Sequence, residues 1–166
     1  IQLIVRPAKP GWEKDYEGHP PICEIMGMGR IIQDERQEDG RYNLMVAGVA
    51  RVRLEEEIQR EPFRMARVEV LRERPAEKSD APRKRLLLLA FAAQMLKELA
   101  KDAPALPQDT PLGVVCDLVA ALLGLDGDTR QSLLEELDVA ARCDRILDRL
   151  QGPSAPGRWP PAPSLN

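Results

Sequence analysis

The dipeptide Asp39-Gly40 is the feature that most restricts how this chain of 166 residues can fold. It lies between two apolar runs, and Asp-Gly in that setting is a strong signal for a β-hairpin, because glycine adopts the positive φ of a short turn at no steric cost. After the turn, Tyr42, Leu44 and Val46 alternate with more polar or flexible side chains. This period of two predicts a strand with one buried face.

The residues around this hairpin predict the rest of a small sheet. Gly48 interrupts the second apolar run, and Ala50, Val52 and Leu54 continue it. We therefore expect a strand, the turn, a strand, a glycine bend at a bulge or corner, and a further strand. Residues 1–6 read as a strand, 7–21 as a loop, 55–62 as a charged connection and 63–71 as another strand.

From residue 84 the apolar period changes to that of helices. A first helix occupies the following turns, and a second begins at Pro111 with Gly124 as its C-terminal cap. Asp126 or Asp128 can cap a third helix, and Asp138 can cap a fourth. The chain thus combines a β-rich part with a helical part.

Two ordered sets of residues resemble the N-terminal domain family of Lon-type ATP-dependent proteases. In the strand region the residues that carry the resemblance are Gly27, Gly29, Arg30, Ile31, Asp39, Gly40, Gly48 and Arg51. In the helical region, within TRQSLLEELDVAARCDRILDRL, they are Gln131, Leu133, Leu134, Glu135, Asp138 and Arg142. The resemblance implies an α+β fold, with a small curled PUA-like sheet or pseudo-barrel followed by a bundle of about four helices.

The expected organisation has four parts. Residues 1–72 form the β-rich part, which lacks the first strands of the resembled family, and residues 73–83 form a polar linker that contains two prolines. Residues 84–152 form the helical part, and residues 153–166 form a Pro-rich flexible tail.

Composition and motifs exclude several kinds of site. Three well-separated cysteines without a C-x-x-C pair indicate reduced, buried thiols in a cytoplasmic protein, and a single histidine, His19, leaves too few ligands for a metal. No apolar run is long enough to span a membrane, and no cofactor motif is present.

General nucleotide-binding and hydrolase motifs are also missing from the sequence. There is no Walker phosphate loop, no H-E-x-x-H and no G-x-S-x-G. The resembled proteases carry their ATPase and Ser–Lys protease modules after this domain, and this chain ends where those modules would begin. We therefore expect a protein that is not an enzyme.

The resemblance implies that the chain recognises unfolded or tagged polypeptides, with a separate ATP-dependent protease as a further candidate partner. Trp12 and Tyr16 are candidate contacts, because these residue types are enriched in binding hot spots, and Met26, Met28 and Ile32 are candidates for an adaptable apolar face. The alternatives are that the aromatic pair covers the end of the sheet and that both faces of the methionine strand are buried.

A PUA-like RNA-binding module is the alternative function. The strand arginines that could line one face are Arg30, Arg41, Arg51, Arg53, Arg64 and Arg67. The net charge of −3 and the few aromatic residues weigh against this function, because nucleic-acid binding depends on phosphate neutralisation and base stacking. An undetected hydrolase is a third, weaker hypothesis.

Overall fold

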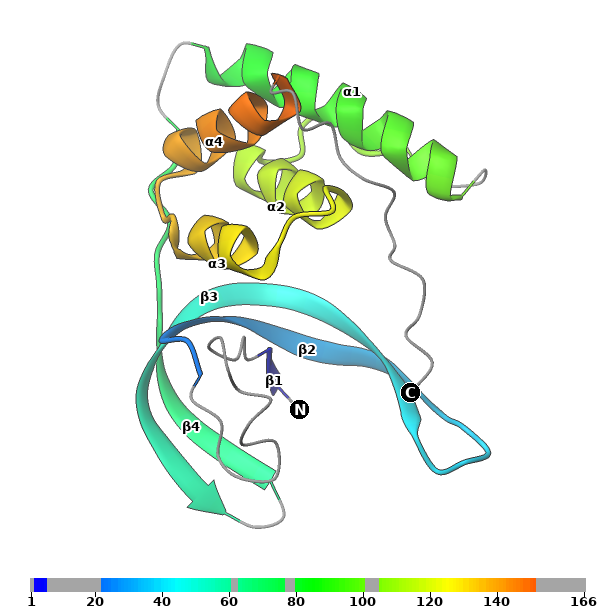
Figure 1. The fold of residues 1–166 in the computed structure, drawn as a ribbon, viewed down its shortest axis with the longest axis vertical. Coiled ribbons are helices and arrows are strands. Elements are labelled where there is room, and N and C mark those ends of the chain that lie inside the picture. The colour runs from blue at the N-terminus through cyan, green and yellow to red at the C-terminus, as the bar shows by residue number, and fades with distance from the viewer. Residues whose placement is uncertain (1, 6–21, 61–62, 77–79, 101–104, 152–166) are drawn as a thin grey trace. The chain divides into compact units, whose positions relative to one another are not determined.

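The computed structural model describes residues 2–5, 22–60, 63–76, 80–100 and 105–151 (Figure 1). The chain divides into two compact units, residues 1–72 and 73–166. The described residues of the first unit form four strands and those of the second form four helices. The predicted α+β class is therefore confirmed.

The first unit is one antiparallel sheet with the strand order β1-β2-β3-β4. Its strands are β1 (Gln2–Val5), β2 (Ile25–Arg36), β3 (Tyr42–Arg60) and β4 (Phe63–Val70). The strands predicted at residues 1–6 and 63–71 are confirmed to within one residue at each end. Neighbours in the sheet follow each other in sequence, so every pairing is between consecutive strands.

The predicted hairpin is confirmed, and its turn is closed as the sequence indicates. Gly40 has φ +86°, the left-handed conformation that glycine adopts most readily. The N–H of Gly40 donates to the carbonyl of Gln37 at 3.1 Å. The Asp39 carboxylate accepts from the backbone N–H of Arg41 at 3.0 Å and from its Nε at 2.7 Å.

Strand β3 is longer than predicted. We expected a break after Gly48 and a charged connection at residues 55–62, whereas β3 runs without interruption over 19 residues. The acidic residues of this segment can lie in a strand because arginines of β4 face them across the ladder. Arg67 donates to Glu56 at 2.7 Å, and Arg64 is hydrogen-bonded to Glu57.

Three β-bulges interrupt the ladders. The extra residue is Ile32 in β2, and it is Val49 and then Glu55 in β3. The bulge at Val49 directly follows Gly48, so the predicted glycine-associated bulge is confirmed. Each extra residue shifts the alternation of side chains by one position. Two residues of a strand that are an even number of positions apart therefore lie on opposite faces of the sheet when one bulge lies between them.

The second unit contains α1 (Ala81–Leu99), α2 (Leu112–Leu122), α3 (Gly127–Glu135) and α4 (Val139–Gln151). Helix α1 begins three residues earlier than predicted, because a proline in the first turn lacks only an N–H that has no helical partner. Helix α2 packs against both α1 and α4. The buried core residues are Leu88, Leu89, Ala92, Val115, Cys116, Val119, Leu122, Leu123, Leu133, Cys143 and Ile146.

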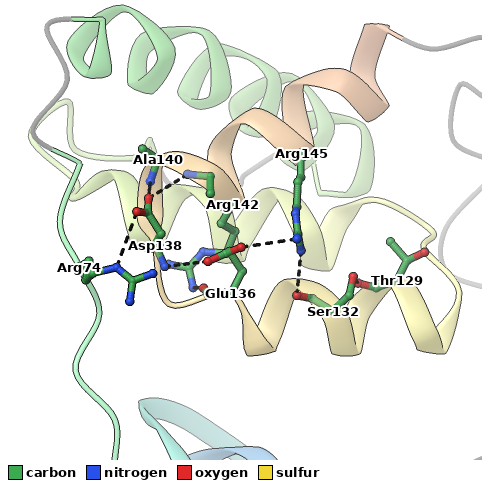
Figure 2. A network of polar contacts seen from close by, with 9 residues as sticks. Arg74, Thr129, Ser132, Glu136, Asp138, Ala140, Arg142 and Arg145 are labelled. Carbon is green, nitrogen blue, oxygen red and sulfur yellow. Dashed lines mark hydrogen bonds and ion pairs between the residues drawn. The ribbon is translucent and has the colours of Figure 1, made fainter.

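Two of the predicted helix caps are confirmed and one is wrong. The Asp126 carboxylate accepts from the N–H of Thr129 at 2.8 Å, and the Asp138 carboxylate accepts from two N–H groups of the first turn of α4, at 2.9 and 3.0 Å (Figure 2). Gly124 does not cap α2. That helix ends at Leu122, its C-cap residue is Leu123 in an extended conformation, and Gly40 is the one described glycine with positive φ.

A buried arginine joins the start of this unit to its last helices. Arg142 is fully buried and donates to the Glu73 carboxylate at 2.5 Å and to the carbonyl of Glu136 at 3.2 Å. Its Nε lies 3.6 Å from the Asp117 carboxylate. Figure 2 shows this side chain beside Glu136, with Arg74 next to the start of α4. Residues 73 and 74, which we predicted to belong to a linker, therefore contact the helical unit directly.

Candidate polypeptide-binding surface

The β2–β3 hairpin continues beyond the part of the sheet that a third strand covers. Among the described residues, β1 pairs with residues 27–30 of β2, and β4 pairs with residues 52–60 of β3. Residues 31–36 and 42–46 therefore form a two-stranded ribbon, which we call the arm (Figure 1). A two-stranded ribbon has few neighbours of its own, so most of its side chains are accessible.

The arm exposes large apolar side chains. The exposed fractions are 58% for Ile32, 55% for Tyr42, 46% for Leu44 and 56% for Met45. We call these four residues the arm surface; it spans both faces of the ribbon, because Leu44 and Met45 are consecutive in the strand. Tyr42 and Leu44 were predicted to be buried, and this prediction is wrong. An apolar surface of this kind on a protein commonly marks a site of interaction.

Two features explain the error: no third strand covers residues 42–46 among the described residues, and a bulge lies at Val49. Without the bulge, Leu44 and Val46 would lie on the same face of β3 as Val52, which is fully buried. The extra residue reverses the alternation, so Leu44 and Val46 lie on the face opposite to Val52. The alternation of Tyr42, Leu44 and Val46 thus predicts a face buried with the core, whereas the structure places this face opposite to Val52.

The structure separates the residues that were predicted to bind polypeptide. Met26 and Met28 are buried and pack with Val52 in the core of the sheet, so the expectation that they form an exposed face with Ile32 is corrected. Ile32 is exposed because it is the extra residue of the bulge in β2. Trp12 and Tyr16 lie outside the described residues.

The arm also has open hydrogen-bonding edges. One side of β2 at residues 31–36 and one side of β3 at residues 42–50 have no neighbouring strand among the described residues. Such edges can pair with an extended peptide, which adds a strand to the sheet. Backbone pairing and apolar contacts are thus available at one place.

The arginines that could have formed a basic face are largely paired with carboxylates. Arg53 bonds Glu69 at 2.9 Å, and the arginines that face Glu56 and Glu57 are described above. The Arg41 guanidinium, by hydrogen bonding, lowers the pKa of the Asp39 carboxyl. A strand arginine in such a pair has little free charge to offer a phosphate.

Other kinds of site are not seen in the described part of the chain. No group of three or more histidine, cysteine or acidic side chains there could hold a metal ion. In those same ranges, no helix combines the length and the apolar character that crossing a bilayer requires.

Comparison with solved structures first defines the class of domain. A Lon N-terminal domain protein from Xanthomonas campestris superposes with a TM-score of 0.56 at 20% identity, covering 89% of this chain and 88% of that one. The N-terminal domain of a Mycobacterium avium complex Lon protease gives the same TM-score at 14% identity, covering 88% of both chains. The fold is therefore that of Lon N-terminal domains.

Sequence comparison then gives the family. The model of the ATP-dependent protease La (LON) substrate-binding domain matches residues 2–152, so the chain belongs to this family. A Lon protease from Paraburkholderia phytofirmans is 36% identical over 124 residues, which is 69% of this chain and 15% of that protease. Lon protease 2 from Myxococcus xanthus is 28% identical over 142 residues, 81% of this chain and 17% of the relative. The chain thus spans less than a fifth of these relatives.

Proposed function

We propose that this chain binds unfolded or tagged polypeptides without catalysing a reaction on them, and that the arm surface contacts the client. The observation that carries the proposal is the exposure of Tyr42, Leu44 and Met45 on a two-stranded ribbon with open edges. The family description, a substrate-binding domain of an ATP-dependent protease, supports it. A cytoplasmic location and a separate ATP-dependent protease as partner are further parts of this proposal.

The physical basis is the match between the arm and an unfolded segment. An unfolded chain offers apolar side chains and unpaired backbone groups together, whereas a folded protein hides both. The arm surface takes the side chains, and the open edge of β2 or β3 pairs with the backbone. Met45 adds a flexible side chain that adapts to different clients.

The RNA-binding alternative has less support. Arginines at positions 41, 53, 64 and 67 are engaged by carboxylates, and the chain carries a net charge of −3. Binding through phosphate contacts would have to break these pairs.

The proposal is tested by titrating the chain into a fluorescently labelled, permanently unfolded reporter protein and following anisotropy. Ile32→Ser combined with Leu44→Ser removes apolar area that is half exposed, which is worth roughly 1 kcal/mol per residue on binding. The two losses add to about 2 kcal/mol, so we expect the double variant to bind about 30-fold more weakly.

Leu87→Ser is the matched control, because Leu87 is 52% exposed but belongs to α1 and not to the arm. It should bind the reporter like the unmodified chain. Equal binding by the arm variant and the unmodified chain would refute the assignment of the arm. Absence of binding by the unmodified chain would refute the function itself.

A further inference from the structure

We infer that a cavity in the helical unit binds the C-terminal carboxylate of a polypeptide together with the apolar side chain of its last residue. This inference rests on the proposed function and assigns a second contact to the same clients. The cavity has a volume of about 670 Å³ and is lined by Glu73, Pro75 and Ala76 and by the beginnings of α1, α2 and α4. This volume is in the range of sites that hold small ligands.

Arg85 provides the charge that such a ligand would need. It lines the cavity from the second turn of α1 and is partly buried. Its Nε is buried without a hydrogen-bond partner, and no ion pair to Arg85 occurs among the described residues. A partly buried guanidinium without an anion is less stable than a paired one. A carboxylate in the cavity would pair with the part of the Arg85 guanidinium that remains accessible.

The start of α2 adds positive potential to the same cavity. Pro111, Leu112, Gly113 and Val114 all line it, and no side chain caps this helix. The first N–H groups of a helix have no partner within the helix, and the helix dipole places partial positive charge there. The Glu73 carboxylate already lies close to this helix start, with its Oε2 3.2 Å from the position that a Cβ of Gly113 would take, so the assignment rests on Arg85.

The remaining lining determines which anion fits. Most of it is apolar, including Leu112, Val114 and Val139. The one acidic side chain in the lining is Glu73, which is held by Arg142. Its negative charge disfavours a ligand with several charges, such as a phosphate group. The Arg85 guanidinium beside this apolar lining therefore suits a ligand that has a single negative charge and an adjacent apolar group.

A polypeptide C-terminus has this combination. Its carboxylate and its last side chain are attached to one Cα, so both can enter a pocket of limited size. An internal Asp or Glu would require the chain to enter the cavity and leave it again. We therefore assign the cavity to chain ends.

The test uses the whole chain and two labelled peptides of one sequence that end in leucine, one with a free C-terminal acid and one with a C-terminal amide. Anisotropy titration should show that the amide binds at least tenfold more weakly than the acid. Arg85→Gln should weaken binding of the acid by roughly 10- to 100-fold, the range for one lost charge-assisted contact, and should leave the amide unaffected. Arg85→Lys should restore part of the affinity.

Two further variants guard against a fold defect. Arg83→Gln removes an exposed arginine from the first turn of α1 and should bind the acid normally. Val114→Trp fills the mouth of the cavity from a half-exposed position and should abolish binding of the acid. All variants are compared by thermal unfolding.

Equal binding of acid and amide, unchanged binding by Arg85→Gln, or no binding of the acid at all would each overturn the inference. Displacement of the acid peptide by inorganic phosphate at similar concentration would also overturn it, because the cavity would then be a general anion site. The Ile32→Ser and Leu44→Ser arm variant should keep peptide binding while it loses the unfolded reporter. Failure of the cavity assignment and failure of the proposed function are therefore distinguishable.

Discussion

Replacement of Glu73 by glutamine tests what the buried Arg142 contributes to the helical unit. Arg142 is fully buried, whereas the Glu73 side chain keeps 34% of its exposure. A hydrogen bond to a charged group contributes about 1.5–3 kcal/mol, and partial exposure places this one in the lower half of that range. Asp117, at 3.6 Å, and the carbonyl of Glu136 remain as partners of the cation. We therefore expect Glu73→Gln to lower the free energy of unfolding by about 2 kcal/mol.

The assay is urea unfolding followed by helical circular dichroism, on both single variants and the double variant with Arg142→Met. The double variant should be less destabilised than the sum of the singles by at least about 1 kcal/mol, because the pair is lost only once. Arg74→Gln is the neighbouring control, since its pair with Asp138 is long, at 3.7 Å, and exposed. It should change stability by less than about 0.5 kcal/mol. Additive effects, or a Glu73→Gln cost no larger than that of the control, would refute the reasoning.

Three further predictions concern glycine packing, an acid-sensitive cap and thiol access. Gly29→Ala should destabilise the sheet by about 1–3 kcal/mol in urea unfolding, because a Cβ would lie 3.0 Å from a carbonyl oxygen of β3 and closer still to a valine, whereas Gly27→Ala meets nothing within 4 Å and should be neutral. Hydrogen bonds from a threonine in α3 lower the pKa of Asp126, so its stabilisation is present above the unfolded-state pKa near 4 and is lost as the pH falls through the lower folded-state value. Asp126→Ala should therefore remove part of the acid dependence of unfolding, and an unchanged pH profile would contradict this. Thiol titration of the native chain should label Cys23, which is half-buried, much faster than the fully buried Cys116, and equal rates would show that the helical core opens readily.

Features set by neighbouring residues could be predicted from the sequence. The turn at Asp39-Gly40 and the caps Asp126 and Asp138 each depend on contacts within a few residues, and all three are present in the structure. The positions of the helices follow from the apolar period for the same reason.

Features set by long-range pairing could not be predicted. The bulge at Val49 depends on the register between two strands, and this single extra residue places Leu44 and Val46 on the face opposite to Val52. The continuation of β3 past residue 55 depends on arginines that lie on another strand. Arg142 is one of the residues that carry the family resemblance, but its burial depends on Glu73, which is 69 positions away in the sequence.

The length of β3 has a consequence for the lifetimes of its hydrogen bonds. At residues 52 and 53 the strand is paired with both β2 and β4 and lies beside the buried Met26, whereas at residues 42–46 it is paired on one side alone among the described residues. Local opening costs little free energy where few buried contacts are lost and much where many are lost. Amide hydrogens of the arm should therefore exchange with solvent far faster than those a few residues further along the same strand. The middle of β3 thus stays paired, whereas its first residues, in the arm, open and pair again. A client segment can then pair with β3 in place of β2 in the arm while the core of the sheet stays closed.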